Sequence, residues 1–150
     1  MTTTDDSAVF VDANILVYFT FDHFPWHAAA RARLAGLAGA AVTLSTSRQA
    51  LREFLAVTTR PGFMSPMPTM VFLAAAVQGF ERQFEILEDD PEVTALLLEL
   101  LEEPGARGRQ VHDANIVATL RRYGIPNLLT HNTSDFARYR PWITVLPLIA

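Results

Sequence analysis

The chain contains no cysteine and no lysine, and both absences narrow the chemistry open to it. Without cysteine, the protein has no disulfides, no thiolate zinc site and no cysteine nucleophile. Without lysine, Schiff-base chemistry is excluded, and so is a P-loop, whose lysine contacts the phosphates. All 12 basic residues are therefore arginines.

Long apolar runs are also missing. The longest candidates, near residues 70–77 and 96–101, are shorter than the roughly 18 residues that a membrane span needs. Residues 1–7 lack the basic and apolar parts of a signal peptide, so we expect a flexible N-terminal tail and one domain over residues 8–150 of a cytoplasmic protein. The net charge of −4 does not suggest nucleic-acid binding, although a basic patch can outweigh the total.

Short apolar runs alternate with segments of helical periodicity along the chain. Runs rich in β-branched residues predict strands, and apolar residues three and four apart predict helices. The predicted strands cover residues 8–11, 41–44, 84–87, 127–130 and 143–146. The predicted helices begin near residues 14, 25, 47, 69, 91 and 110, and a short helical turn is expected at 134–139. This alternation indicates an α/β domain whose mainly parallel sheet is covered on both faces.

The stretch Ala8–Tyr18, AVFVDANILVY, is the segment around which the rest is organised. Asp12 follows a buried strand, and Asn14 is a suitable cap for the next helix because its side chain accepts from free amides of the first turn. Asp12 is therefore expected at the carboxyl end of a strand, where open α/β folds bind ligands.

Most of the 16 acidic residues look like solvated surface. One run surrounds a single predicted helix, which is typical of an exposed face. Its members are Glu88, Asp89, Asp90, Glu92, Glu99, Glu102 and Glu103. Four others stand beside apolar sequence, namely Asp12, Glu53, Asp113 and Asp135. Strand ends and the helix starts that follow them share one edge of a parallel sheet; the three aspartates can reach that edge, whereas Glu53 requires its helix to pass above it.

Each of the four carboxylates also has an ordinary structural explanation. The aspartates can complement helix N-termini, and Glu53 can pair with Arg48 or Arg52. If all four converge, however, like charges raise one another's pKa and cost stability. A divalent cation resolves this conflict, because Mg²⁺ and Mn²⁺ favour oxygen ligands. Metal-bound water at such a site can attack a phosphodiester without any protein nucleophile.

Histidines and tryptophans do not suggest a second site. His23 and His27 are four residues apart, but Pro25 between them prevents a shared helical face, so a zinc pair is not expected. Trp26 and Trp142 are interpreted as core or dimer contacts in preference to base-stacking platforms.

Four ordered segments resemble the successive motifs of PIN-domain proteins, and specifically of the VapC-like toxins of bacterial type II toxin–antitoxin pairs. They are VFVDANILVY, SRQALREFLAVTTRPG, VHDANIVATLRRYGIP and LLTHNTSDFARY. The resemblance runs from Val9 to about Leu148, although the region Gly62–Pro91 carries no such motif. Four motifs in order are much more specific than a single Asp-x-Asn.

This resemblance implies a three-layer α/β/α sandwich and a Mg²⁺- or Mn²⁺-dependent endoribonuclease. Its implied catalytic and metal-binding residues are Asp12, Glu53, Asp113 and Asp135. The polar residues implied to support the site are Asn14, Thr130 and Asn132. The resemblance also implies an RNA substrate, an antitoxin partner whose C-terminal segment covers the site, and a homodimer.

Arginines are the expected RNA contacts, because a guanidinium binds phosphate in bidentate fashion and stacks on bases. The candidates are Arg48, Arg52, Arg60, Arg107, Arg109 and Arg138. Arg48 and Arg52 are four residues apart and so share one helical face. An ordinary solvated arginine is the alternative for each of the six.

Two other functions fit parts of the pattern. A receiver-like phosphoacceptor also places an aspartate at a strand end, but it relies on a late lysine that this chain lacks. A non-catalytic PIN-fold module would keep only an RNA- or protein-binding surface. The complete set of four acidic residues argues against that module.

Overall fold

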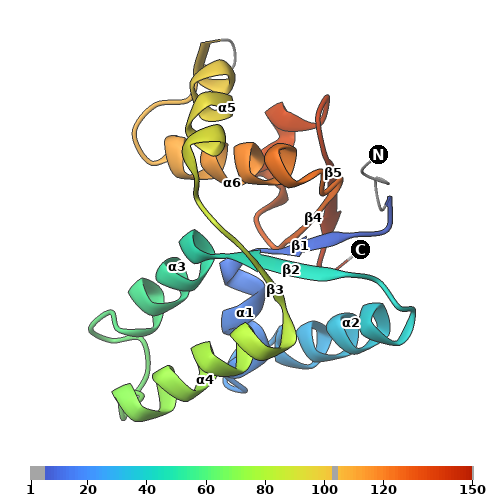
Figure 1. The fold of residues 1–150 in the computed structure, drawn as a ribbon. Helices are drawn as coiled ribbons and strands as arrows, with labels where there is room; N and C mark the ends of the chain where they lie inside the picture. The colour runs from blue at the N-terminus through green and yellow to red at the C-terminus, as the bar shows by residue number, and fades with distance from the viewer. Residues whose placement is uncertain (1–5, 103–104, 150) are drawn as a thin grey trace.

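The computed structural model describes residues 6–102 and 105–149. Its five strands form one sheet in which every pairing is parallel, in the order β3-β2-β1-β4-β5 (Figure 1). The strands are β1 (Val9–Val11), β2 (Leu44–Ser47), β3 (Glu85–Leu87), β4 (Asn127–Thr130) and β5 (Thr144–Pro147). Most of the predicted N-terminal tail lies outside the described residues.

The helices connect these strands as the periodicity predicts. They are α1 (Ala13–Thr20), α2 (His27–Gly39), α3 (Arg48–Thr58), α4 (Met70–Gln83), α5 (Pro91–Glu102), α6 (Gln110–Tyr123) and the 3₁₀ helix η1 (Thr133–Tyr139). The region without a family motif thus supplies α4 and β3. None of the described helices is long and apolar enough to cross a membrane.

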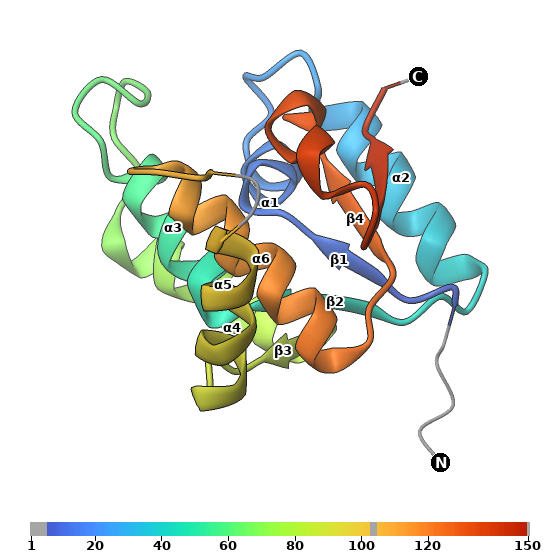
Figure 2. The same cartoon turned by 90° about the horizontal axis from the view of Figure 1, so that it is seen from above.

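The sheet has a hydrophobic layer on each face. Successive strand residues point to opposite faces, so Val9 and Val11 pack with α1, α2 and α4, while Phe10 packs with α5 and α6. Figures 1 and 2 show these helices on the two sides of the sheet. All three side chains are 2% exposed or less. The predicted three-layer α/β/α sandwich with a parallel sheet is therefore confirmed.

Strand β2 lies three residues later than predicted. The expected strand was 41–44, and the observed one begins at Leu44 and contains three buried hydroxyl residues. Burial is tolerated because the Thr46 Oγ1 hydroxyl donates to the Val11 carbonyl at 2.9 Å, and Ser45 donates to Val9 at 3.5 Å. Ser47 ends the strand and caps α3, as its side chain accepts from the Ala50 amide at 3.1 Å.

The acidic run around α5 is mainly solvated surface, as predicted, but one member has a structural role. Asp90 is half-buried, accepts from the Val93 amide at 3.0 Å and pairs with Arg122 at 3.1 Å. Asp90 thereby caps α5 and ties it to α6. Glu103 lies outside the described residues.

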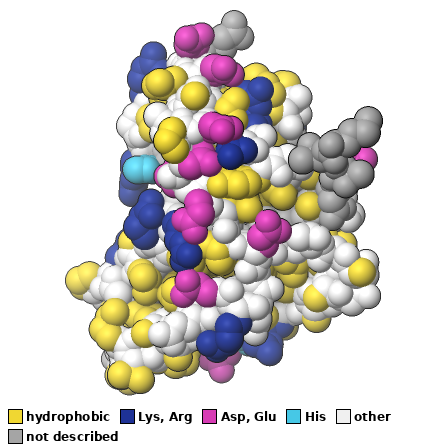
Figure 3. Space-filling model, viewed as in Figure 1, with side chains coloured by type: hydrophobic (Ala, Val, Ile, Leu, Met, Phe, Trp, Pro, Cys, Tyr) yellow, Lys and Arg dark blue, Asp and Glu magenta, His cyan; other side chains and the backbone are white. Residues whose placement is uncertain are grey.

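Apolar side chains are exposed where α4 begins. Met70 is 62% exposed, Val71 83% and Phe72 46%, and Met67 precedes them in the connecting loop at 39%. Figure 3 shows hydrophobic side chains gathered at the lower left, over this part of the fold, while acidic and basic side chains mix along the middle of the same face.

Candidate active site

The four predicted acidic residues line one cavity of about 470 Å³. β1 is central, and the chain reaches β2 on one side of it and β4 on the other. Connections that leave such a sheet in opposite directions open a crevice at the carboxyl ends of the strands. Asp12 follows β1, Asp135 lies in η1 after β4, and α3 and α6 bring Glu53 and Asp113 to the same cavity.

Asp12 is the most buried of the four and starts a helix as well as lining the cavity. Its side chain is the N-cap of α1, where Oδ1 accepts from the Ala13 amide at 2.8 Å. Asp12 is only 7% exposed. The prediction that Asn14 caps this helix is wrong, because Asn14 lies within the first turn of α1.

A polar network fixes the second carboxylate oxygen of Asp12. The buried Thr130 hydroxyl donates to Oδ2 at 2.8 Å, and the Asn14 amide approaches the same oxygen at 3.4 Å. Asn14 also donates to Thr130 Oγ1 at 3.2 Å and accepts from the His131 amide at 3.1 Å. The backbone N–H of Asn132 donates to Thr130 Oγ1 at 3.1 Å. The structure therefore brings Asn14, Thr130 and Asn132 together around Asp12.

Glu53 reaches the cavity from the second turn of α3, which the sequence alone did not place. Its Oε1 accepts from Gln49 Nε2 at 3.0 Å. Asp113 lies in the first turn of α6 and Asp135 in the first turn of η1. The four carboxylates therefore come from four separate helical elements, and three of them lie where their element begins.

The carboxylates perturb one another electrostatically. Burial, with smaller contributions from the charges of Asp12 and Asp113, raises the pKa of Glu53 to about 7. Burial and the charges of Asp12 and Asp135 raise the pKa of Asp113 to about 6. Burial also raises the pKa of Asp12, although its hydrogen bonds from Thr130 and Ala13 oppose this shift. The site therefore resists holding several negative charges at neutral pH.

The donor set fits Mg²⁺ or Mn²⁺, which prefer carboxylate and amide oxygens. In the described residues, no three acidic or histidine side chains lie close enough together, as they stand, to hold a metal ion. The fit therefore rests on chemistry: four carboxylates line one cavity, and burial together with the neighbouring carboxylate charges raises the pKa of Glu53 and Asp113 despite the charges of Arg52 and Arg138.

The pKa shifts predict how the stability of the metal-free protein changes with pH. Because the folded-state pKa values of Glu53 and Asp113 lie above their ordinary values of 4.5 and 3.8, their protonated forms favour folding. The contribution of these two protonated groups to folding stability is fully present below about pH 4. It is lost as pH rises through about 6 and 7, the folded-state pKa values of Asp113 and Glu53. We expect the free energy of unfolding, measured by urea denaturation in EDTA, to fall from pH 5 to pH 7.5 by roughly 2 kcal/mol, which is about half of what the two shifts would give without solvent screening of these half-buried groups.

Glu53→Gln provides the control for this pH series. The variant removes the group that titrates highest, so its stability should change less than that of the wild type between pH 6 and pH 7.5. A wild-type stability that rises across this range would contradict the assigned shifts.

Of the six arginine candidates, Arg60 and Arg109 line the cavity. The charges of Arg52 and Arg138 lower the pKa of Glu53 and Asp113, respectively, although neither side chain lines the cavity. The Arg107 guanidinium donates to the neighbouring Ala106 carbonyl at 2.7 Å. Two arginines are thus placed to meet a ligand in the cavity directly.

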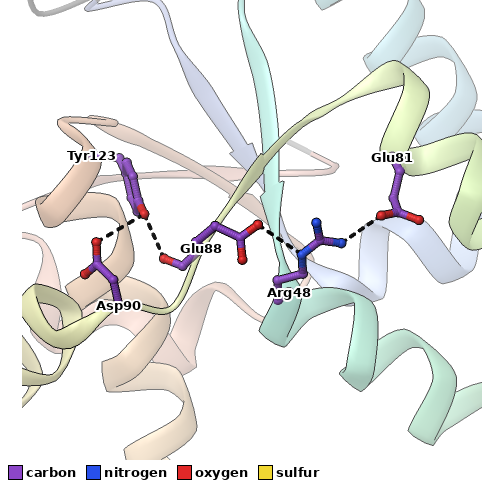
Figure 4. Close-up of polar contacts among 5 residues, drawn as sticks. All are labelled: Arg48, Glu81, Glu88, Asp90 and Tyr123. Atoms are coloured by element: carbon purple, nitrogen blue, oxygen red, sulfur yellow. Dashed lines mark hydrogen bonds and ion pairs between the residues drawn. The ribbon is translucent and has the colours of Figure 1, made fainter.

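Arg48 is engaged elsewhere. Its guanidinium contacts Glu81 of α4 at 2.7 Å and Glu88, just after β3, at 3.2 Å (Figure 4). The Glu88 carbonyl in turn accepts from the Tyr123 hydroxyl of α6 at 2.9 Å. Arg48 therefore belongs to a chain of polar contacts that connects α3, α4 and α6.

Several residues of the site were not singled out from the sequence. Tyr18 and Phe24 line the cavity and pack edge to face with their ring centroids 5.1 Å apart. Trp26 packs against Tyr18, at 4.9 Å, and against His131, at 4.5 Å, which agrees with its interpretation as a packing residue. Gln49 holds Glu53, and the only signal for it was its spacing of four residues from a glutamate on one helix.

Comparisons with known proteins agree with this architecture. The chain resembles VapBC2 from Rickettsia felis, solved with a DNA fragment from its promoter, at 21% identity and a TM-score of 0.67, covering 93% of this chain and 98% of that one. A toxin–antitoxin complex from Klebsiella pneumoniae is 22% identical with a TM-score of 0.63, and the match covers 95% of this chain and 98% of that one. VapC20 from Mycobacterium tuberculosis, a Sarcin-Ricin loop cleaving toxin, is 20% identical with a TM-score of 0.60, and the match covers 81% of this chain and 87% of that one. These likenesses concern the fold.

A search among curated proteins found no match. The family description of the PIN domain, in contrast, matches residues 9–140, which include all four acidic residues and the polar residues around Asp12. The match also includes α4 and β3, for which the sequence showed no motif. The chain therefore belongs to the PIN domain family.

Proposed function

We propose that this protein is a metal-dependent endoribonuclease that hydrolyses RNA phosphodiester bonds in the cytoplasm as the toxin of a toxin–antitoxin pair. The observation that carries the proposal is the convergence of Asp12, Glu53, Asp113 and Asp135 on one cavity from four separate elements. Asp12 is buried and Glu53 and Asp113 are half-buried, and like charges gathered around one cavity are unfavourable unless a cation joins them. The resemblance to VapC-like toxins supports RNA as the substrate.

The four carboxylates would hold Mg²⁺ or Mn²⁺. When bound, the ion would supply a nucleophilic water and stabilise the charge that develops on the phosphate. The chain's own residues prepare that site: Thr130 and Asn14 fix the orientation of Asp12. Arg60 and Arg109 place positive charge in the same cavity, where it would orient a phosphodiester.

The proposed partners follow from the same resemblance. Two of the similar structures are described as toxin–antitoxin complexes or bound to promoter DNA, and we infer an antitoxin for this chain as well. A homodimer is also proposed. Apolar residues are exposed at the start of α4. Exposed apolar patches often mark protein–protein contacts, which supports an assembly that covers this surface.

The decisive experiment expresses the chain with and without its genomic neighbour and maps the RNA ends that appear. We expect growth arrest and new RNA ends only when the chain is expressed alone. Purified protein should cleave the same RNA in Mg²⁺ or Mn²⁺ and stop in EDTA. Cleavage that EDTA leaves undiminished would overturn the metal-dependent mechanism, and RNA binding without cleavage would favour the non-catalytic module.

The arginines of the cavity predict a specific salt dependence of RNA binding. In a cleavage-deficient background, Arg60→Ala and Arg109→Ala should each weaken RNA binding and reduce the slope of log affinity against log salt by about 0.7, as expected for one lost phosphate contact on a single strand. Filter binding at several salt concentrations measures the slope. Arg48→Ala is the matched control, because Glu81 and Glu88 already hold its guanidinium; an equal effect from this variant would contradict the placement.

A further inference from the structure

Gln49 is a buried polar side chain beside the proposed metal site. It lies in the first turn of α3, four residues before Glu53, and is 6% exposed. A buried side-chain amide is costly unless its donors and its acceptor are all bonded. The partners that Gln49 has found therefore indicate what it does.

All of those partners belong to the two helices that carry Glu53 and Asp113. Gln49 Nε2 donates to Glu53 Oε1 at 3.0 Å and to the His112 carbonyl at 2.8 Å. Gln49 Oε1 accepts from Asn115 Nδ2 at 2.7 Å. The orientation of the amide is settled by these contacts, since the reversed amide would place its oxygen against the His112 carbonyl.

His112 precedes Asp113 in the first turn of α6, and Asn115 follows two residues after Asp113. The single amide of Gln49 therefore connects the Glu53 carboxylate to the part of α6 that carries the opposing carboxylate. Asn115 also approaches Asp89 at 3.4 Å, which extends the network towards the connection after β3. The two hydrogen bonds from Gln49 to α6 join residues that are 63 and 66 positions apart in the sequence, so they fix a tertiary distance and not a local one.

We propose that Gln49 is a positioning residue for the metal site, which fixes the orientation of Glu53 and the separation between the α3 and α6 walls. This inference rests on the proposed function. Two like-charged carboxylates that face each other repel without a metal ion. A neutral amide that bonds one of them and anchors to the helix of the other holds both near a shared ligand without adding a counter-charge.

Gln49→Met tests this role, because methionine has a similar length and keeps the apolar contacts but cannot make the three hydrogen bonds. We expect its Kd for Mn²⁺, measured by titration calorimetry, to rise about 10- to 100-fold, which is the usual effect of removing a residue that orients metal ligands. The kcat for RNA cleavage should fall while KM for RNA stays within about twofold, because Arg60 and Arg109 are unchanged.

Thr58→Val is the matched control for a purely structural effect. Thr58 is fully buried on the same helix and donates to the Phe54 carbonyl at 2.9 Å, but it does not line the cavity. Both variants should melt at a lower temperature than the wild type, and only Gln49→Met should lose Mn²⁺ affinity. Equal losses of affinity in the two variants would show that Gln49 is merely structural and would overturn the proposal.

Asn115→Ala keeps the test decisive if Gln49→Met does not fold. This variant frees the Gln49 amide while keeping its bond to Glu53 available, so we expect a smaller loss of Mn²⁺ affinity in the same direction. An unchanged Kd in Asn115→Ala would contradict the bridge. If the wild type binds Mn²⁺ but the variants give these negative results, the positioning role alone is refuted. If the wild type neither binds Mn²⁺ nor cleaves RNA, the proposed function and this inference are refuted together.

Discussion

Asp12→Asn should lower RNA cleavage on the order of 10³-fold or more and should abolish growth inhibition. The substitution removes a charged ligand from the centre of the proposed metal site, where preorganised electrostatic contacts supply much of the catalytic effect. Initial cleavage rates of the purified variant, measured in saturating Mn²⁺, test this expectation directly. Colony formation after induction without the antitoxin gives the second readout.

The same variant should keep its fold. Asparagine retains an oxygen for the Ala13 amide, and its Nδ2 can donate to Thr130 Oγ1 in place of the bond observed at 2.8 Å. Because burial raises the pKa of Asp12, removing the charge should leave the metal-free melting temperature equal to or above that of the wild type at pH 7.5. The exposed Asp22 provides the control, since Asp22→Asn should retain full activity. Normal cleavage by folded Asp12→Asn would refute the metal-site assignment.

Mn²⁺ should stabilise the folded protein strongly at neutral pH. A ligand that binds only the folded state at 100 times its Kd contributes about 2.7 kcal/mol. For a chain of 150 residues, that corresponds to a rise in melting temperature of about 5–10 °C. The rise should grow with pH through about 6 and 7, as Asp113 and Glu53 lose the protons that compete with the metal. Thermal melts at pH 5.5 and 7.5, with Mn²⁺ or EDTA, measure both effects.

Asp12→Asn should show little of this stabilisation. The variant therefore separates binding at the acidic site from weak association of Mn²⁺ with other surface carboxylates, such as those around α5. A shift of equal size in the variant and the wild type would place the bound ion elsewhere.

The order of the elements followed from the sequence because local signals agreed with the tertiary fold. Apolar runs marked β1 and β4, Thr69 caps α4 through the Phe72 amide at 3.1 Å, and Gly124 ends α6 with a left-handed φ of 67°. Strand β2 was misplaced for a tertiary reason. Ser45 and Thr46 donate to carbonyls of β1, and only Ser47 caps α3, whereas all three look like helix caps when only the sequence is considered.

The site was harder to predict where it depends on contacts between distant elements. Asp12 and Asp135 follow strands, so the rule that strand ends share an edge placed them. Glu53 depends on how α3 crosses that edge, which periodicity does not specify. Gln49 could not be found for the same reason, because its partners on α6 lie more than 60 residues away. Arg48 was considered for RNA on helical spacing, yet two glutamates from other elements hold it.

The pairing of β1 with β4 has a consequence for synthesis of the protein. Asp12 leaves the ribosome well before its partner Thr130 and the last of the four acidic residues, Asp135, which follow more than 110 residues later. At about 5–20 residues per second, that interval lasts several seconds. During that interval the nascent chain carries an incomplete set of carboxylates, and the cavity can assemble only once β4 and η1 have emerged.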